Sequence, residues 1–442
     1  MINSPPDDRA HDRARDSQHP SPGYRREYHG PDSRIPTPVP GEDVVVDPPE
    51  IDSDSDDLVG TLTAEEPQPD VALATDAALW AVVLAGGIGS RFWPLSTPER
   101  PKQLLALVGD RPLIADTVAR LAPLIPAERV LVVTSRDIAD ALHAAIPEVP
   151  AANMLIEPRP LGTAAALAWG AHEVARRAGP TTVFVTLHAD LAAAFPDEFR
   201  RVLRQGAGIA AADDLLVALA AKPTRPETGF GYMVPGAALE PDLPRSAGGA
   251  KRVERFVEKP GTILAEEMIG RGAWWNTGVL LGQARVVIEA LAAQTPELQH
   301  GLPALTAGRL DRFAGLIQSV SIERGLLERT DRLVALPVDC GWDDVGTWAC
   351  LRRVRDLDDT GNGVSGEAHL VDAFSNIVHA ESGKVVVYGV SQMLVVTLPG
   401  LTFVTSLERA KELKPLLDQL PSELRPRPAS DEKGRSAGGA VG

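Results

Sequence analysis

Short apolar runs alternate with amphipathic, alanine-rich segments between residues 78 and 345. The runs are apolar at nearly every position, as in strands that are buried on both faces, and the segments between them have the spacing of helices. This alternation predicts an α/β domain with a mostly parallel, Rossmann-like sheet. The expected strands cover 80–84, 130–134, 154–156, 182–187 and 215–220, and a helix is expected over 163–178 with Thr163 as its N-cap.

The pattern changes after Trp348. Short β-rich segments follow at 368–371, 376–379, 384–388, 393–397 and 402–405, with Gly, Ser or Asp between them. Regularly spaced short strands predict a small C-terminal β-rich unit, either a fragment of a sandwich or a few coils of a β-helix. A final helix is expected over 407–420.

The expected division is a leader over 1–75, a catalytic α/β domain over 76–350, a β-rich domain over 351–422 and a flexible tail over 423–442. The leader is rich in Pro, Asp, Arg and Ser without apolar periodicity, which predicts disorder. Residues 1–76 hold 18 acidic and 6 basic side chains and so carry most of the net charge of −16. Because the remainder is nearly balanced, we do not expect nucleic acid as a partner.

The chain has neither a secretory signal pattern nor an apolar run of about 18 residues, so no membrane association and a cytoplasmic location are expected. Its two cysteines, Cys340 and Cys350, are too few for a disulfide framework and lack metal-ligand spacing. We expect both to be reduced.

A glycine-rich segment follows the first expected strand. Gly86, Gly87 and Gly89 lie at the carboxyl end of that strand, where open α/β sheets bind ligands. Glycine lets backbone N–H groups approach phosphate oxygens, and Arg91 and Lys102 bring positive charge to the same place. The alternative is a tight turn with a backbone role only. The segment therefore predicts a polyphosphate site.

Carboxylates occur at two distant positions. Asp190 ends an apolar strand, and Asp343 and Asp344 lie in a glycine-flanked turn that is expected to open a helix. Two carboxylate ligands, completed by phosphate oxygens and water, suit Mg²⁺. The competing interpretation of both positions is a helix N-cap.

A third group of polar residues is a candidate sugar-phosphate site. Glu258 and Lys259 end an expected strand just before a proline, which favours Lys259 contacting a phosphate and Glu258 accepting from sugar hydroxyls. Such pairs are otherwise solvated surface charges. Asn276 follows Trp274 and Trp275, and its amide can donate to and accept from vicinal hydroxyls, although paired tryptophans are often only core.

Taken in order, segments 84–103 and the later motifs resemble the mannose-1-phosphate guanylyltransferase branch of the sugar-1-phosphate nucleotidyltransferases, notably at 92–96 and at Pro101-Lys102-Gln103. The resemblance implies a GT-A-like fold with a β-helix-like C-terminal domain, and transfer of a guanylyl group from GTP to α-D-mannose 1-phosphate with Mg²⁺, giving GDP-mannose and pyrophosphate. It implies catalytic roles for Arg91, Lys102, Asp190 and Lys259. The implied binding residues are Leu84, Ala85, Gly86, Gly87, Gly89, Ser90, Arg91, Lys102, Glu157 and Thr163 for the nucleotide, Gly231, Glu258, Lys259 and Asn276 for the sugar phosphate, and Asp190 and Asp344 for the metal.

Glu157 is the candidate for guanine, because a carboxylate accepts from both guanine N1–H and the exocyclic amine. Two departures from the family pattern affect specificity. Leu161 and Gly162 replace the usual Arg-Asn before Thr, and the usual Pro-x-Asp-His reads His188-Ala-Asp-Leu191. The choice of base and hexose is therefore the open part of the hypothesis.

Two alternatives stay open: a sister nucleotidyltransferase with another base or hexose, and a non-catalytic paralogue that binds nucleotide sugars. Retention of Lys102, Asp190 and Asp344 disfavours the second. A fused phosphomannose isomerase is not expected, because the region beyond 350 holds only two histidines, His369 and His379. A homodimer is the candidate assembly.

Overall fold

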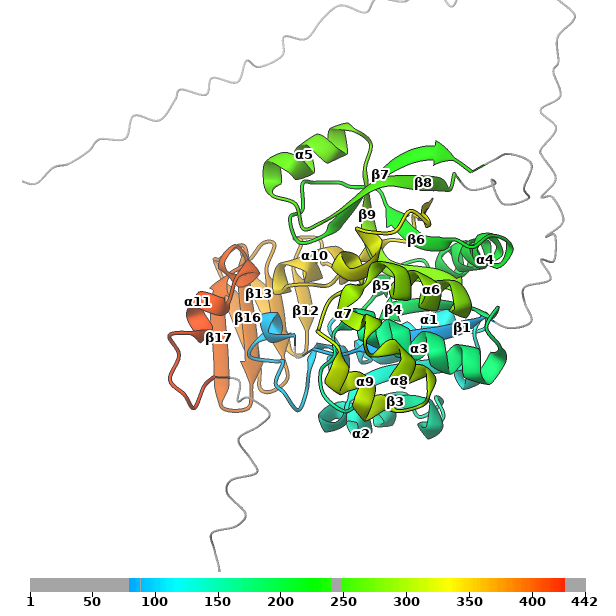
Figure 1. The fold of residues 1–442 in the computed structure, drawn as a ribbon. Coiled ribbons are helices and arrows are strands. Elements are labelled where there is room, and N and C mark those ends of the chain that lie inside the picture. Colours follow the sequence, from blue (N-terminus) through cyan, green and yellow to red (C-terminus); the bar gives the residue numbers. More distant parts are fainter. Residues whose placement is uncertain (1–78, 88, 240–248, 426–442) are drawn as a thin grey trace, which may run out of the picture. The chain divides into compact units, whose positions relative to one another are not determined.

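The structure, a computed structural model, describes residues 79–87, 89–239 and 249–425. The predicted leader, 1–75, and the last part of the predicted tail, 426–442, lie outside the described residues. Nine strands form one sheet in the order β3-β2-β1-β4-β9-β6-β10-β8-β7 (Figure 1). In that order the strands are Met154–Glu157, Val130–Ser135, Trp80–Ala85, Val183–His188, Trp274–Gln283, Leu216–Ala221, Leu333–Pro337, Lys251–Glu258 and Gly231–Ala238.

The five strands expected from the apolar runs are all present within one residue of their predicted bounds. β3, β2, β1 and β4 are parallel neighbours, and β6 pairs in parallel with β10. β9 runs antiparallel between β4 and β6, and β7 and β8 extend the sheet as an antiparallel pair. The predicted Rossmann-like α/β class is confirmed, with an antiparallel strand in the middle of a mixed sheet.

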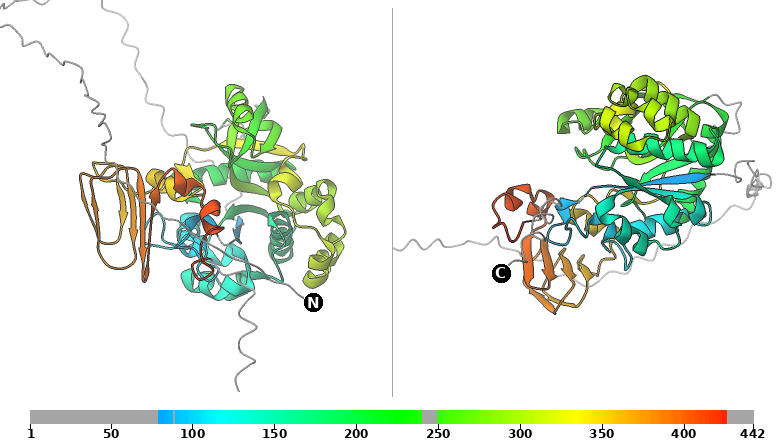
Figure 2. Two further views of the ribbon diagram at one scale, coloured as in Figure 1. Left: turned by 90° about the vertical axis from the view of Figure 1, so that its left-hand side faces the viewer. Right: turned by 60° about the horizontal axis from the view of Figure 1, so that its bottom comes forward.

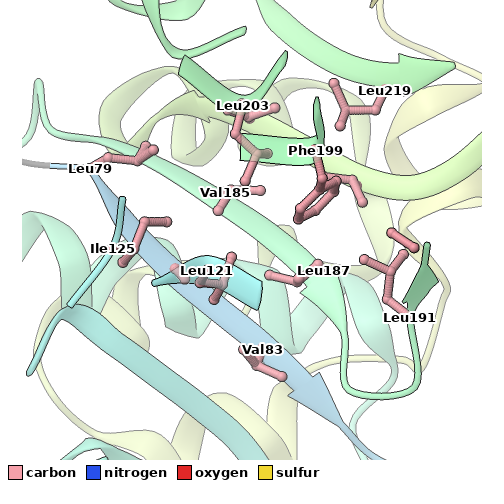
Figure 3. Packing of buried hydrophobic residues seen from close by; sticks show 14 of the residues in the cluster. Leu79, Val83, Leu121, Ile125, Val185, Leu187, Leu191, Phe199, Leu203 and Leu219 are labelled. Atoms are coloured by element: carbon pink, nitrogen blue, oxygen red, sulfur yellow. The ribbon is translucent and has the colours of Figure 1, made fainter. Parts of the chain in front are cut away.

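Helices cover both faces of this sheet. Side chains alternate along β1, so Val83 lies in one buried cluster with Val185 and with Phe199 and Leu203 of α4 (Pro196–Ala212), whereas Val82 lies in the cluster on the opposite face (Figure 3). The first face is covered by α1 (Leu113–Leu121), α2 (Arg136–Ala145) and α4 (Pro196–Ala212), and the second by α3 (Thr163–Ala178), α6 (Ala284–Gln294), α7 (Pro296–Gln299), α8 (Leu302–Thr306) and α9 (Leu310–Leu316).

None of the helices in the described ranges is long and apolar enough to cross a membrane.

Helix α3 has the predicted bounds, but the prediction of its N-cap is wrong. Gly162 is the N-cap residue at φ +90°, and no side chain caps the helix. The Thr163 hydroxyl instead accepts a hydrogen bond of 3.0 Å from the N–H of Ile322, because the loop before the helix packs against that segment.

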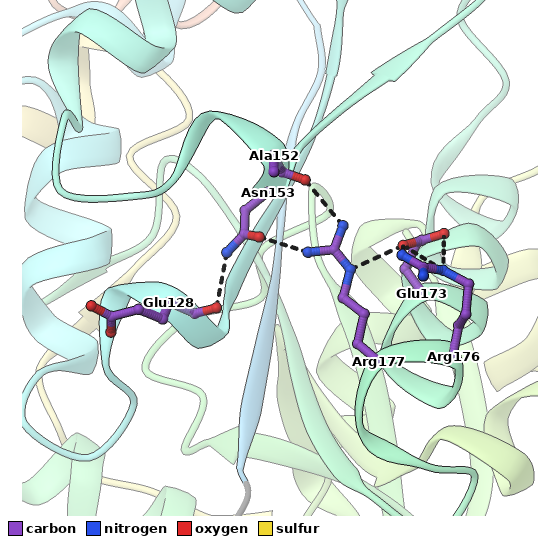
Figure 4. Close-up of polar contacts among 6 residues, drawn as sticks. All are labelled: Glu128, Ala152, Asn153, Glu173, Arg176 and Arg177. Atoms are coloured by element: carbon purple, nitrogen blue, oxygen red, sulfur yellow. Dashed lines mark hydrogen bonds and ion pairs between the residues drawn. The ribbon is translucent and has the colours of Figure 1, made fainter.

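The C-terminal end of α3 is fixed to the loops beside β3 (Figure 4). Arg177 donates to Asn153 Oδ1 at 2.6 Å and to the Glu173 carboxylate at 3.0 Å. Asn153 in turn donates to the backbone oxygen of Glu128 at 2.9 Å. This network anchors the edge strand whose last residue is the predicted base-binding carboxylate.

The C-terminal strands form coils (Figure 2). One parallel stack brings Val364, Val378 and Val395 into register. A second parallel stack pairs β13 (Ala368–Val371) with β15 (Val385–Tyr388). Parallel pairing of strands that are successive turns of the chain distinguishes a β-helix from a sandwich. The strands are β12 (Gly363–Ser365), β13 (Ala368–Val371), β14 (Ile377–Ala380), β15 (Val385–Tyr388), β16 (Met393–Leu398) and β17 (Leu401–Ser406), the last of them antiparallel to β16.

The expected helix over 407–420 is wrong in most of its length. Only a turn at Arg409–Lys411 and the short α11 (Lys414–Leu417) are helical. Glu412 is extended at φ −136°, and Pro415 has no N–H to continue a helix from the preceding residues.

The β-coils contact the segment that follows the glycine-rich loop. Phe92, Trp93 and Leu105 share one buried cluster with Trp348 and with Leu394 of β16. The Trp348 indole donates to the backbone oxygen of Trp93 at 3.1 Å, and its ring lies 5.3 Å from that of Phe92. The C-terminal domain therefore supports the segment that carries Lys102.

Candidate active site

The glycine-rich loop leaves β1 with open space above it. A Cβ atom at Gly86 or Gly87 would meet no atom within 4 Å, so a ligand can approach this backbone closely. From below, the buried amide of Gln103 donates to the backbone oxygens of Ala85 and Gly87, each at 3.3 Å. The sequence analysis assigned no role to Gln103, and its place beside Lys102 in the Pro-Lys-Gln motif was the available signal.

Gly89 is required by its neighbours. It has φ +69°, and a Cβ there would collide with the side chain of Lys102. The Gly89 backbone oxygen accepts from the hydroxyl of buried Ser96 at 2.8 Å. Lys102 can therefore pass directly over the loop, with its ammonium 5.6 Å from the centre of the Phe92 ring.

Lys102 joins the two predicted metal ligands. Its ammonium donates to Asp190 Oδ2 at 2.7 Å and to the backbone oxygen of Asp344 at 3.1 Å. Asp190 follows β4, and the next helix, α4, has Phe195 at its N-cap, so Asp190 is not a helix cap. The structure thus brings together residues that are far apart along the chain.

The two carboxylates differ in their electrostatics. Burial opposes ionisation of Asp190, but the charges of Lys102 and His188 outweigh it and hold the pKa of Asp190 below its usual value. Burial, reinforced by the negative charge of Asp343, raises the pKa of Asp344 to about 6, with Lys102 acting in the opposite direction. At neutral pH both groups can serve as anionic oxygen ligands.

Asp343 and Asp344 have different surroundings. Asp343 belongs to β11 (Trp342–Asp343), which pairs with β5 (Ala192–Ala193), and its carboxylate is bound by Arg353. The expectation that the pair opens a helix is wrong, since the next helical turn begins at Trp348 and has no side-chain cap. Donor atoms of Asp343, Asp344 and Cys350 lie within 4.8 Å of one another, but the ion pair already occupies the Asp343 carboxylate.

The main cavity of the site has a volume of about 440 Å³ and is lined by most of the charged residues that the sequence predicts for the site. Arg91 is exposed at its edge and has no hydrogen bond or ion pair among the described residues. The sequence analysis gave no site role to three further lining residues, His188, Thr277 and Trp342. The predicted residues that line the cavity are Gly89, Ser90, Arg91, Lys102, Asp190, Lys259 and Asp344.

Lys259, which also lines this cavity, has a strained backbone with φ +52°. Its ammonium pairs with Glu258 Oε1 at 2.8 Å, and the Lys259 side chain is 54% exposed whereas that of Glu258 is 9% exposed. Burial raises the pKa of Glu258, and nearby carboxylates add to the shift against the opposing charge of Lys259.

Gly231 lies opposite Glu258 in the β7–β8 pair. A Cβ at Gly231 would lie 2.8 Å from Glu258 Oε2 and 2.7 Å from Phe256 Cζ. Glycine therefore makes room for the Glu258 carboxylate. Glu258 and Thr163 line a neighbouring cavity of about 580 Å³, to which Lys259 also contributes.

Seven predicted binding residues line neither cavity: Leu84, Ala85, Gly86, Gly87, Glu157, Gly231 and Asn276. Asn276 is 9% exposed, and its Oδ1 accepts from the N–H of Gly278 at 3.2 Å, while the adjacent Thr277 lines the main cavity. Glu157 ends β3, and its Oε1 is buried without a hydrogen-bond partner. Burial raises the pKa of Glu157 to about 7, against a backbone hydrogen bond from Leu161.

The fold is that of the Rossmann-like α/β nucleotidyltransferases. The nucleotidyl transferase family model matches residues 80–360, more than half of the chain, and the chain belongs to this family of enzymes.

Individual relatives agree with that assignment. The chain is 32% identical over 353 residues to the xanthan biosynthesis protein XanB of Xanthomonas campestris pv. campestris (strain B100), covering 77% of this chain and 73% of that protein. It is 30% identical over 370 residues to the mannose-1-phosphate guanylyltransferase of Sinorhizobium fredii (strain NBRC 101917 / NGR234), covering 80% and 71%. A crystal structure from Thermus thermophilus, described as a mannose-1-phosphate geranyltransferase, matches with a TM-score of 0.70 and 32% identity over 77% of this chain and 98% of that one.

Proposed function

We propose that this enzyme transfers the guanylyl group of GTP to α-D-mannose 1-phosphate and releases pyrophosphate. The observation that carries the proposal is that Lys102, Asp190, Asp344, Arg91 and Lys259 line one and the same cavity. Within it, Lys102 contacts the Asp190 carboxylate and the backbone oxygen of Asp344. The relatives named as mannose-1-phosphate guanylyltransferases support the choice of substrates.

The donor set at the centre of the cavity fits Mg²⁺. Asp190 offers a carboxylate whose pKa is held low, and the Asp344 carboxylate is bonded to no other side chain among the described residues. Hard oxygen ligands that leave positions for phosphate and water are the preferred environment of this ion. When bound by Asp190 and Asp344, Mg²⁺ would neutralise charge on the phosphates.

The reaction needs no protein nucleophile, because the phosphate of the sugar is itself an ionised nucleophile. Its oxygen forms a bond to the α-phosphorus of GTP as the bond to the pyrophosphate oxygen breaks. In our proposal Lys102 and Arg91 hold the nucleotide phosphates and stabilise the leaving pyrophosphate. Lys259 holds the attacking phosphate, so the protein contributes alignment and charge neutralisation.

Guanine is assigned to Glu157. Its buried Oε1 has no partner among the described residues, which is costly for a carboxylate unless a ligand donates to it. Guanine supplies N1–H and an exocyclic amine in the geometry that a carboxylate accepts. Leu161 and Gly162 are packed against the protein rather than presenting polar groups, so Glu157 carries this selection without the side chains that the family pattern has there.

A substrate panel tests the proposal. Pyrophosphate release would be measured with GTP, ATP, UTP, CTP and dTTP, each paired with mannose 1-phosphate and with glucose 1-phosphate, with the Asp190→Asn variant as the inactive control. The expected result is the highest kcat/KM for GTP with mannose 1-phosphate. A higher value for another pair would assign the chain to a sister activity, and no release with any pair would make it a binding protein.

A further inference from the structure

Arg353 and Asp343 form an ion pair directly behind Asp344. Arg353, on α10 (Leu351–Val354), donates from Nε to Asp343 Oδ2 at 2.6 Å and from Nη2 to Oδ1 at 3.1 Å. Asp343 Oδ1 also accepts the N–H of Val345 at 3.0 Å. Both carboxylate oxygens of Asp343 are thus occupied, and the main cavity is lined by Asp344 but not by Asp343.

The turn between these residues is strained. Val345 has φ +45° and is completely buried, although a β-branched side chain disfavours the left-handed region. Such a conformation is unfavourable and persists only where the surroundings enforce it. At the next position, a Cβ on Gly346 would collide with the Asp344 carboxylate, so the turn also holds that carboxylate close to the backbone.

Two bonds to the phosphate-binding side fix the segment that carries Arg353. The Trp348 indole donates to the Trp93 backbone oxygen at 3.1 Å, and Arg355 Nε donates to the backbone oxygen of Leu107 at 2.6 Å. Trp93 and Leu107 flank the part of the chain that carries Lys102. The segment that carries the ion pair is therefore hydrogen-bonded to the segment that carries Lys102.

We propose that the Arg353–Asp343 ion pair is a positioning device that enforces the strained turn and so aims the Asp344 carboxylate at the metal. Arg353 is a positioning residue, since it acts through Asp343 and the Val345 N–H. The proposal rests on the proposed function in one respect, the assignment of Asp344 as a metal ligand. Loss of a group that orients a ligating side chain typically weakens metal affinity about 10- to 100-fold.

The test is a Mn²⁺ titration of the full-length protein with GTP present, followed by electron paramagnetic resonance. Arg353→Ala is expected to raise the Mn²⁺ dissociation constant about tenfold or more, and Arg353→Lys to recover part of the loss because it keeps the charge but not the two-point contact. The matched control is Arg329→Ala. Arg329 also makes two bonds to one carboxylate, both to Glu297 at 2.9 Å, and its side chain is 35% exposed against 38% for Arg353.

A purely structural ion pair would lower the melting temperature in Arg353→Ala and Arg329→Ala alike and leave Mn²⁺ affinity unchanged. The proposal is overturned if Arg353→Ala and Asp343→Asn both bind Mn²⁺ within twofold of the parent, or if the parent binds none. Should Arg353→Ala fail to fold, Arg353→Lys and Asp343→Asn decide by the same criterion. A parent that binds Mn²⁺ but transfers no guanylyl group would remove the proposed function and leave the positioning role standing.

Discussion

Lys102 and Lys259 line the same cavity and are held in different ways. The Lys102 side chain is 9% exposed and is fixed between Asp190 and Asp344, whereas Lys259 is 54% exposed and, within the described part of the chain, pairs only with its neighbour Glu258. The side that we propose for the nucleotide therefore holds buried charges that contact one another, and the side that we propose for the sugar phosphate holds an exposed ammonium on a backbone with positive φ. This difference predicts that changes near Lys102 affect both substrates and the fold, while changes at Lys259 affect one substrate.

The largest effect is expected from Asp190→Asn, which keeps the shape of the side chain but removes the charge that both Lys102 and a metal would use. We expect kcat to fall on the order of 100-fold or more, since a metal ligand contributes several kcal/mol to the transition state. Turnover measured across Mg²⁺ concentrations checks this. Near-normal turnover at limiting Mg²⁺ would leave Asp190 as a partner of Lys102 only.

Lys102→Ala is the next in size. It should lower kcat/KM for GTP by about 2 to 4 kcal/mol of transition-state stabilisation, because a buried cation that contacts the phosphates is lost. It should also raise the pKa of Asp190, whose ionisation Lys102 favours. A double-mutant cycle with Asp190→Asn measures the coupling free energy between Lys102 and Asp190. We expect the combined loss of transition-state stabilisation to be well below the sum of the two single losses. Additive losses would mean that the two residues act independently.

The contrast between the two sides also explains what the sequence could predict. The parallel strands β1 and β2 are buried on both faces, so apolar runs such as 130–134 predicted them, and the glycines at 86, 87 and 89 marked the loop that follows β1. The contacts of Gln103 and Arg353 could not be predicted, since each is made with a partner that only the fold brings close, Gly87 and Asp343 respectively.

The wrong predictions were local ones. Thr163 and Asp343 are residue types that commonly cap helices, but the Thr163 hydroxyl accepts from Ile322 and the Asp343 carboxylate accepts from Val345 instead. The terminal helix failed because the chain is extended at Glu412 and Pro415, which has no N–H, lies in the first turn of a separate short helix, α11.

On the sugar side, Lys259→Ala is expected to raise the KM for mannose 1-phosphate about tenfold while the KM for GTP changes less than about twofold, because the exposed ammonium contacts one phosphate only. Steady-state kinetics with each substrate varied in turn separates the two constants. Lys384→Ala is a suitable control. Lys384 pairs with Glu367 in the C-terminal β-rich region, and its side chain is 76% exposed, against 54% for Lys259. Equal changes in both constants would place Lys259 in contact with the nucleotide as well.

The smallest expected effect is a pH dependence that is confined to the nucleotide side. Burial raises the pKa of Glu157 to about 7, so the group changes from the acid to the carboxylate as pH rises through neutrality. Only the carboxylate accepts from both guanine donors, and the KM for GTP should therefore fall a few-fold, on the order of 1 kcal/mol, between about pH 6 and 8. The KM for mannose 1-phosphate should not follow it.

The pH dependence of the free energy of unfolding tests the titration of Glu157 independently of substrate binding. The folded chain binds the Glu157 proton more tightly than the unfolded chain, so its contribution to the free energy of unfolding is greatest in acid and is lost as pH rises from the ordinary glutamate value through about 7. Glu157→Gln removes this titration, so the variant should flatten both the pH profile of the KM for GTP and the pH dependence of unfolding over that interval. If the unfolding profile flattens but the GTP profile does not, Glu157 is a buried titrating group that does not contact the base, and guanine selection has to be assigned to another part of the nucleotide side.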